Sequence, residues 1–195
     1  MSSDGTSLRA GPHIAIDSEW FRLKQGTLTN DQKVAELFER LRPSVYRYLV
    51  VLTGNPPEAE EVTQEAFLRL CQCLQEGQAI AHPRTWVFRV AHNLAIDQRL
   101  SRKYLAPLQP SSWDELCQFR PDPHPNPEQS ILLQEHFQRL QTALRKLSGI
   151  QRECLTLRAD GFKYEQIAEI LGVSVANVAQ SLRRGIRRLM EETHA

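Results

Sequence analysis

Apolar residues in the last third of the chain recur at helical spacing. Residues 164–171 form a short apolar-striped segment that ends at Gly172, a residue able to adopt the positive φ with which helices commonly end. Ser174 then stands where an N-cap belongs. The following segment repeats apolar residues at spacings of four, four and three, which predicts one continuous buried stripe: Val178, Leu182, Ile186 and Leu189. The pattern predicts a helix-turn-helix.

The opposite face of the second predicted helix is polar at its start and basic at its end. Asn177 and Gln180 come first, and four arginines follow within the six residues 183–188. Amides in the leading turn suit base edges, and arginines behind them suit phosphates. A solvated face of an ordinary helical bundle is the alternative. The glycine, valine and serine of the turn, together with the arginine density, favour DNA binding.

The rest of the chain is also patterned as helices. Apolar stripes predict a helix from an N-cap at Asn30, a second segment opened by Pro43 and ended by residues 54–55, and long helices over 56–75 and 84–103. Amphipathic segments at 130–147 and 150–158 precede the helix-turn-helix. No strand-like alternation of any length occurs, so the fold class is all-α.

Six prolines lie between residues 107 and 127, a density that opposes a packed helix and favours an extended connector. We therefore expect two small helical domains joined by a proline-rich linker. The predicted divisions are a flexible N-terminal extension (1–29), a first domain (30–104), the linker (105–129) and a helix-turn-helix domain (130–195).

The first domain carries two faces with opposite chemistry. Helix 56–75 is rich in Glu and Gln in its first half, which suits either a protein-docking face or a solvated surface. Helix 84–103 has Trp86 and Phe88 near its start and Arg99, Arg102 and Lys103 at its end. Aromatic rings and cations suit unpaired DNA bases and their backbone. The alternative is that both rings fill the core and the cations complement the helix dipole.

Composition narrows the function classes. The formal net charge is only +1, so nucleic-acid contacts must come from local patches. No apolar run approaches the length of a membrane span, and the N-terminus lacks the charged-then-apolar order of a signal peptide, so we expect a cytoplasmic protein without membrane insertion. The four cysteines and six histidines lack metal-ligand spacing, and no phosphate loop or nucleophile motif occurs. We expect no metal, no cofactor and no enzymatic activity.

Three motifs in this order resemble the extracytoplasmic-function (ECF) sigma factors of the sigma-70 family. They are LTGNPPEAEEVTQEAFLRL (52–70), HPRTWVFRVAHNLAID (82–97) and LSGIQRECLTLRADGFKYEQIAEILGVS (147–174). The resemblance covers about residues 33–103 and 135–192. It implies sigma region 2 in the first domain and region 4 in the second. It also implies a protein that binds core RNA polymerase and directs transcription from promoters with −10 and −35 elements.

The resemblance assigns roles to individual residues. The set implied to contact core polymerase, at the clamp helices of its largest subunits, is Glu61, Gln64, Glu65 and Leu68. The set implied to open and read the −10 element is Gln78, His82, Arg84, Trp86, Arg89, Asn93, Arg99, Arg102 and Lys103. The set implied to read the −35 element is Tyr164, Ser174, Asn177, Gln180, Arg183, Arg184 and Arg187. Further implied partners are the polymerase flap, promoter DNA and an anti-sigma factor.

The recognition helix departs from the family habit. Relatives commonly continue the serine cap with Thr-Val-Lys-Ser-Arg, whereas residues 177–181 here read Asn-Val-Ala-Gln-Ser. Two cations are missing at the front of the helix, which should lower the salt dependence of binding by about one unit of slope per lost phosphate contact. We expect Asn177 or Gln180 to read a base edge, because an amide pairs with adenine in a bidentate fashion.

A second hypothesis is a stand-alone helix-turn-helix transcriptional regulator. Such a protein would act as a dimer on a palindromic site without core polymerase. The acidic helix and the basic aromatic helix ahead of a tether argue against it, because a repressor needs neither. Start-site-specific RNA synthesis with core polymerase separates the two hypotheses.

Overall fold

The structure is a computed structural model that describes residues 29–103 and 143–194. Within these ranges the chain is helical and contains no strand, which confirms the all-α class. The helices are α2 (Asn30–Thr53), α3 (Pro56–Gln75), α4 (Pro83–Lys103), α7 (Gly149–Ala159), α8 (Tyr164–Leu171) and α9 (Val175–His194). The predicted N-terminal extension and the proline-rich linker lie outside the described residues, as does most of the amphipathic segment 130–147.

Helix α2 is continuous through Pro43, and the prediction of a separate segment opened by this proline was wrong. Pro43 is exposed, so its missing N–H and its ring fall on the solvent side, while Leu41 and Val45 on either side of it are buried. Burial of the flanking stripe holds the helix together across the interruption. The N-cap is Thr29 rather than Asn30, and Thr29 and Gln32 cap each other reciprocally.

The turn between α2 and α3 follows the predicted residues. Gly54 takes φ 68° and ends α2, and its N–H donates to the Val50 carbonyl. The Asn55 side chain then accepts the Glu58 N–H at 3.4 Å and begins α3, with Pro56 in the first turn. The two helices consequently run back along each other.

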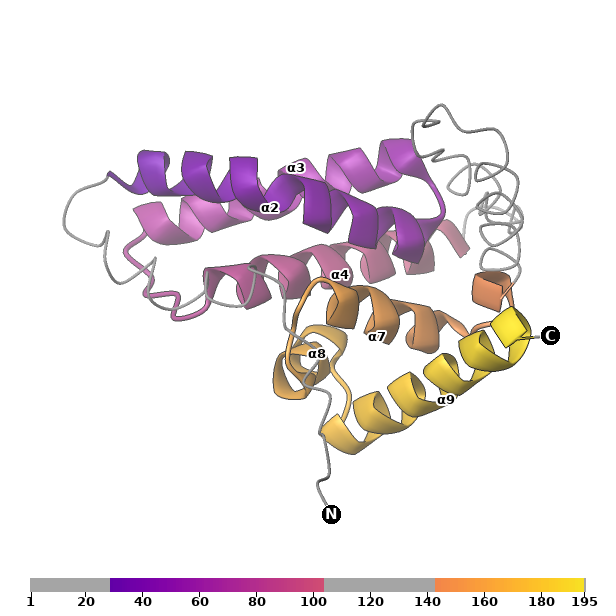
Figure 1. Cartoon of the computed structure of the whole chain (residues 1–195). Helices are drawn as coiled ribbons and strands as arrows, with labels where there is room; N and C mark the ends of the chain where they lie inside the picture. Colours follow the sequence, from indigo (N-terminus) through magenta and orange to yellow (C-terminus); the bar gives the residue numbers. More distant parts are fainter. Residues whose placement is uncertain (1–28, 104–142, 195) are drawn as a thin grey trace, which may run out of the picture.

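Helices α2, α3 and α4 form a bundle, and the second group of helices packs beneath it, with α8 against α4, α7 against α2, and α9 against α7 and α8 (Figure 1). Buried side chains of both halves join in one apolar core. Phe162, from the turn before α8, is fully buried and meets the Phe88 ring of α4 edge-on at 4.8 Å. The two groups of helices are therefore in direct contact.

Helix α9 buries only the first half of the predicted apolar stripe. Val178 and Leu182 are buried, but Ile186 is 46% exposed, so its place in a buried stripe was wrong, and Leu189 is only half-buried. Steps of four residues advance about 40° around a helix, so two of them carry Ile186 off the contact face. Gly185 is buried there instead, and a Cβ on it would meet Leu155 Cδ1 of α7 at 3.0 Å.

Candidate nucleic-acid interface

The turn that leads into α9 is built as the sequence predicts. Gly172 takes φ 64° and ends α8, and Val173 is half-buried against the core. The Ser174 hydroxyl accepts the Asn177 N–H at 3.2 Å, so Ser174 is an N-cap. This geometry fixes where the first turn of α9 begins and which of its side chains point away from α8.

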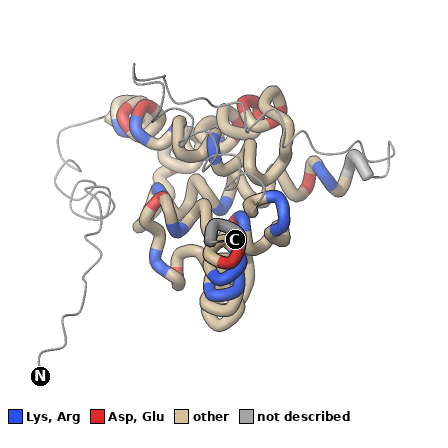
Figure 2. The backbone as a smooth tube through the Cα atoms, turned by 45° about the vertical axis from the view of Figure 1, so that its right-hand side comes forward, with Lys and Arg blue, Asp and Glu red and all other residues tan. Residues whose placement is uncertain are grey.

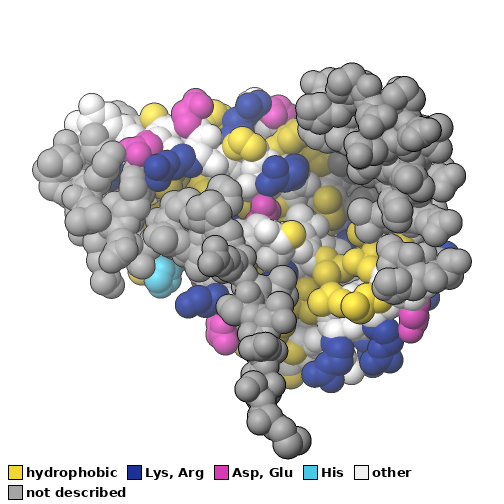
Figure 3. Space-filling view, viewed as in Figure 1, with side chains coloured by type: hydrophobic (Ala, Val, Ile, Leu, Met, Phe, Trp, Pro, Cys, Tyr) yellow, Lys and Arg dark blue, Asp and Glu magenta, His cyan; other side chains and the backbone are white. Residues whose placement is uncertain are grey.

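The residues predicted to read the −35 element lie on the exposed face of α9 and beside it. Asn177, Gln180, Arg183, Arg184 and Arg187 are exposed, and Tyr164 of α8 is 37% exposed. Figure 2 marks the basic positions along α9, and Figure 3 shows basic side chains gathered along the lower edge of the molecule, where this helix lies. Within the described residues the three arginines form no ion pair, so their charges are available to an external ligand.

The amide of Asn177 is oriented from within the helix. The Ser181 hydroxyl, nearly buried, donates to Asn177 Oδ1 at 3.3 Å. This bond uses one lone pair of the amide oxygen, so the second lone pair and the amide nitrogen remain for a ligand. Asn177 and Gln180 line a shallow hollow together with Ser174 and Arg183.

The residues predicted to act on the −10 element differ in how far α4 exposes them. Trp86 is half-buried and packs against the core, and Asn93 is exposed. Arg84 is only 8% exposed, because its guanidinium stacks 4.1 Å from the Phe162 ring centroid and donates to the Asp160 carbonyl. Arg89 pairs with Glu169 of α8 at 3.0 Å. The structure thus brings only part of the predicted set to the surface.

The remaining members of that set lie at the two ends of α4. Gln78 and His82 are exposed in the loop before the helix, where Gly77 has φ 78° and the buried Ile80 anchors the chain. Arg99 is exposed and donates to the Leu52 carbonyl at 3.3 Å. Arg102 and Lys103 belong to the last turn of α4, and their side chains lie outside the described part of the structure.

Phe88 does not present its ring to solvent. It is fully buried between Tyr48 of α2, at 5.7 Å between centroids, and Phe162. For this residue the core interpretation is therefore correct and the base-stacking one wrong. The same side of α4 buries His92, which shares a 2.7 Å hydrogen bond with the Tyr48 hydroxyl.

Burial shifts several ionisable groups where α2, α4 and α7 meet. It lowers the pKa of His92 and raises the pKa of Tyr48, so both are held neutral. Burial also raises the pKa of Glu153, an effect that Arg99 and Arg152 oppose by attraction. The pKa of the neighbouring Cys154 thiol is raised to about 11, chiefly by burial, so this cysteine is unreactive.

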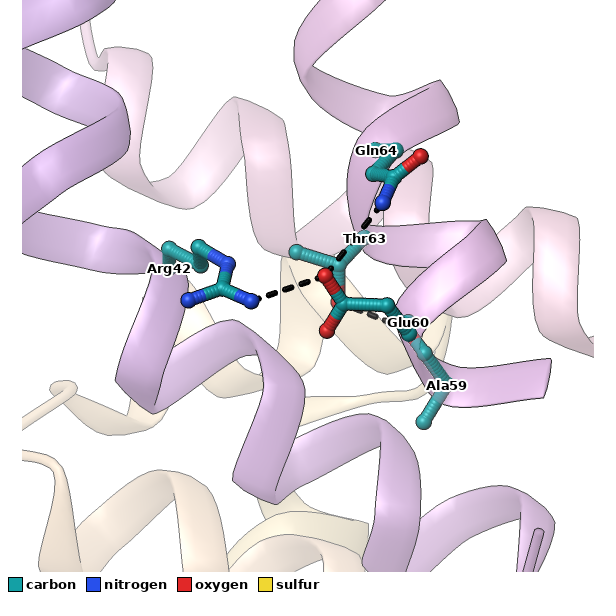
Figure 4. Close-up of polar contacts among 5 residues, drawn as sticks. All are labelled: Arg42, Ala59, Glu60, Thr63 and Gln64. Atoms are coloured by element: carbon teal, nitrogen blue, oxygen red, sulfur yellow. Dashed lines mark hydrogen bonds and ion pairs between the residues drawn. The ribbon is translucent and has the colours of Figure 1, made fainter. Parts of the chain in front are cut away.

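The residues predicted to contact polymerase share one side of α3. Glu61 and Gln64 are exposed, Glu65 is half-buried and pairs with Arg69 at 2.9 Å, and Leu68 is 58% exposed. Figure 4 shows how the start of this face is braced. Arg42 of α2 donates to Glu60 at 2.8 Å, and Gln64 donates to the same carboxylate at 3.3 Å. The hydrogen bond from Arg42 lowers the pKa of Glu60.

Within the described residues no cluster of three or more His, Cys, Asp or Glu side chains is placed to hold a metal ion. None of the described helices is both long enough and apolar enough to cross a membrane. Cys71, Cys73 and Cys154 are free thiols, and Cys117 lies outside the described part.

The arrangement defines a helical protein with a helix-turn-helix whose second helix displays polar and basic side chains. Two family models match it, sigma-70 region 2 over residues 37–104 and sigma-70 region 4 over residues 137–189. The chain belongs to the sigma-70 family and, within it, to the ECF sigma factors.

Individual relatives support this assignment. The chain is 26% identical over 169 residues to the ECF RNA polymerase sigma factor SigK of Mycolicibacterium vanbaalenii, covering 86% of this chain and 85% of that one. It is 33% identical over 162 residues to the ECF RNA polymerase sigma factor SigE of Mycolicibacterium smegmatis, and the match covers 80% of this chain and 60% of that one. The fold resembles that of the sigma factor RpoE of Bartonella quintana, which was solved with the anti-sigma factor NepR. The TM-score is 0.63 at 21% identity, and the match covers 86% of this chain and 99% of that one.

Sequence reasoning missed the residues that cover α4. Asp160, Phe162, Gln166 and Glu169 reach α4 from the second half of the chain, and none carries a DNA-binding signature. The one available signal was Phe162 itself, because a large ring directly after Gly161 in a polar turn indicates burial against another element.

Proposed function

We propose that the protein binds core RNA polymerase through α3 and directs initiation at promoters whose −10 and −35 elements it recognises through α4 and α9. The observation that carries the proposal is the outer face of α9, where Asn177, Gln180 and Arg184 project from the core directly after a capped turn. A helix presented in this way fits the major groove, with its leading residues at base edges.

The polymerase contact is assigned to the polar face of α3. Leu68 is a large apolar side chain 58% exposed beside Gln64 and Glu65, and burial under a partner would remove it from water. The acidic and amide groups around it suit a basic or polar helical partner. This assignment follows the family resemblance and is supported by the exposure of Glu61, Gln64 and Leu68, with Glu65 half-buried among them.

The −10 contact is assigned to α4 and to the loop before it. The exposed Gln78 and His82 lie before this helix, Trp86 in its first turn is half-buried, and Asn93 is exposed. A half-buried ring with exposed amides and cations around it suits unpaired bases. Tethering of the −10 and −35 contacts in one chain gives avidity at a single promoter.

The deciding experiment is transcription by purified protein and bacterial core polymerase, with templates selected from a random promoter library. We expect RNA starting at fixed positions, and loss of polymerase binding in Glu65→Lys. Glu39→Lys makes the same charge change on the exposed surface of α2 and should leave binding intact. A protein that binds DNA as a dimer and starts no transcription would be the stand-alone regulator instead.

The sigma–anti-sigma complex among the similar structures supports one further partner. The relative from Bartonella quintana was solved with an anti-sigma factor. We propose that an anti-sigma protein also binds this chain and keeps it from polymerase in the cytoplasm. Co-purification from the native cell, followed by inhibition of the transcription above, tests this partner.

A further inference from the structure

The second half of the chain lies on the face of α4 that carries Arg84 and Arg89. Thr85 and Phe88 lie on the same face, since positions 84, 85, 88 and 89 are neighbours on a helix. Phe162 packs on Phe88 and Arg84, while Gln166 Nε2 donates to the Thr85 hydroxyl at 3.3 Å. The covering surface consists of α8 and the turn before it.

Each arginine of this face is matched by an acceptor from the second half. Arg84 donates to the Asp160 carbonyl, and Arg89 pairs with the Glu169 carboxylate at 3.0 Å. Further along α4, Arg99 and the Glu153 carboxylate of α7 attract each other. A nucleic-acid oxygen that bound either guanidinium group would have to share or displace the acceptor that the group now has.

A contact from α2 fixes the same turn from the other side. Arg47 donates to Asp160 Oδ1 at 3.0 Å, so Asp160 is held by both α2 and α4. The turn therefore presents one apolar ring and one carbonyl to α4 in a fixed position. The polymerase face of α3, by contrast, stays exposed.

We propose that the chain inhibits itself, with α8 and the turn at 160–163 acting as an internal competitor of single-stranded −10 DNA for α4. The inference rests on the proposed −10 role of α4. In the closed form Arg84 and Arg89 are withheld from DNA, while α3 remains able to dock on polymerase. Reading of the −10 element requires α8 to leave α4, and weakening of their contacts raises the affinity for unpaired DNA.

Closure is tested first without DNA or polymerase. Spin labels go on cysteines replacing the exposed Gln72 of α3 and Ala176 of α9, with serine at Cys71, Cys73 and Cys117 and the buried Cys154 retained. We expect one dominant distance in the otherwise unchanged chain. Arg89→Glu and Glu169→Arg should each shift the distribution to longer distances, and the double variant should restore it. A broad distribution at the outset, or singles that change nothing, would overturn the proposal.

Competition is tested by fluorescence anisotropy with a fluorescein-labelled random-sequence single-stranded DNA of about twelve nucleotides, a length within the range bound by small single-strand-binding folds. Glu169→Gln should bind it about twofold to fivefold more tightly than the wild type, the range expected for an exposed ion pair, because Arg89 and Glu169 are 41% and 48% exposed. Glu165→Gln removes the same charge from an exposed position on α8 and should change nothing. Equal gains in both variants would be a plain charge effect and would overturn the proposal.

Two failures are distinguishable. If Glu169→Gln opens the chain but leaves DNA binding and polymerase binding as they were, the internal competition is wrong and the sigma function stands. If the distances respond as expected but neither the wild type nor any variant starts transcription, the proposed function fails instead. If the internal competition and the sigma function are both correct, Glu169→Gln leaves the affinity for core polymerase unchanged, because the polar side of α3 is accessible in the closed and the open form.

Discussion

Helices α4 and α9 carry the two predicted DNA-reading faces, and the structure treats them in opposite ways. Arg183, Arg184 and Arg187 of α9 are exposed and form no ion pair with the described residues, whereas Arg84 and Arg89 of α4 are held by groups from the second half of the chain. Each of the two helices has an apolar stripe that faces the core and basic residues elsewhere on its surface. The difference shows that exposure of a basic residue depends on what the rest of the fold places over it.

Their supports differ as well. Helix α9 rests on one side against α7 and α8 and leaves the opposite side to solvent. Helix α4 packs against α2 and α3 on one side and against α8 on another, so much of its surface is covered, while Asn93 and Arg99 stay exposed. A helix at the edge of a fold can display its outer face, while a central helix must give up most of it.

The largest expected effect is a loss of stability when the Phe162 ring, which packs the second half of the chain against α4, is removed. Phe162→Ala should lower the free energy of unfolding by about 3–5 kcal/mol, because it deletes a fully buried aromatic side chain from the contact with α4. Urea denaturation followed by circular dichroism measures this loss. Tyr164→Ala, two residues away and 37% exposed, should cost far less. Equal costs would mean that Phe162 does not hold the second half on α4.

The next effect concerns the support of α9. Gly185→Val should cost about 1–3 kcal/mol, because its side chain would have to displace Leu155 of α7, which already lies 3.0 Å from an ideal Cβ. Shortening the neighbour with Leu155→Ala should make the valine less harmful than in the wild-type background. Additive costs in the double variant, again from urea denaturation, would show that the two side chains do not compete for space.

A comparable effect, on recognition rather than folding, separates amides from cations on α9. Replacing both Asn177 and Gln180 by alanine should remove about 1–3 kcal/mol of discrimination at one −35 base pair for each base-reading amide. Selection from a promoter library with reconstituted holoenzyme measures the preference. Arg187→Ala should instead weaken binding evenly across sequences and lower the salt slope by about one. An unchanged preference in the alanine pair would rule out base reading by these amides.

The smallest effect tests the buried side of α4 through pH. The folded-state pKa of His92 lies below its ordinary value of 6.5, so the unfolded chain takes up the proton first as the pH falls. The stability contributed by His92 is complete above about pH 6.5 and declines below it. From pH 7.5 to pH 5.5 the midpoint of urea unfolding should therefore fall further for the wild type than for His92→Gln. The neutral amide of the variant retains a hydrogen-bonding group for Tyr48. Parallel declines would show that His92 is not held neutral.

Much of the local structure follows from the residues in order. Gly172 and Ser174 correctly predicted the turn before α9, and Gly54 with Asn55 predicted the turn before α3. Capping and positive-φ residues allow this because they affect only the backbone within a few residues in sequence. The polar side of α3, which we propose contacts polymerase, was predicted as well, since acidic and amide residues lie opposite a clear apolar stripe. The prediction of a break at Pro43 was wrong because a proline whose ring lies on the solvent side of a helix can be accommodated within it.

The sequence by itself determined the helices, their caps, the helix-turn-helix and the polar outer face of α9, because each depends on neighbours within about one or two turns. Only the tertiary structure decided that Ile186 lies off the contact face of α9, that Phe88 is core, that Arg84 is covered by the turn before α8, and that Arg89 pairs with Glu169 of α8. Those outcomes depend on side chains more than seventy positions apart or on the angle between packed helices. Periodicity along a single helix contains neither kind of information.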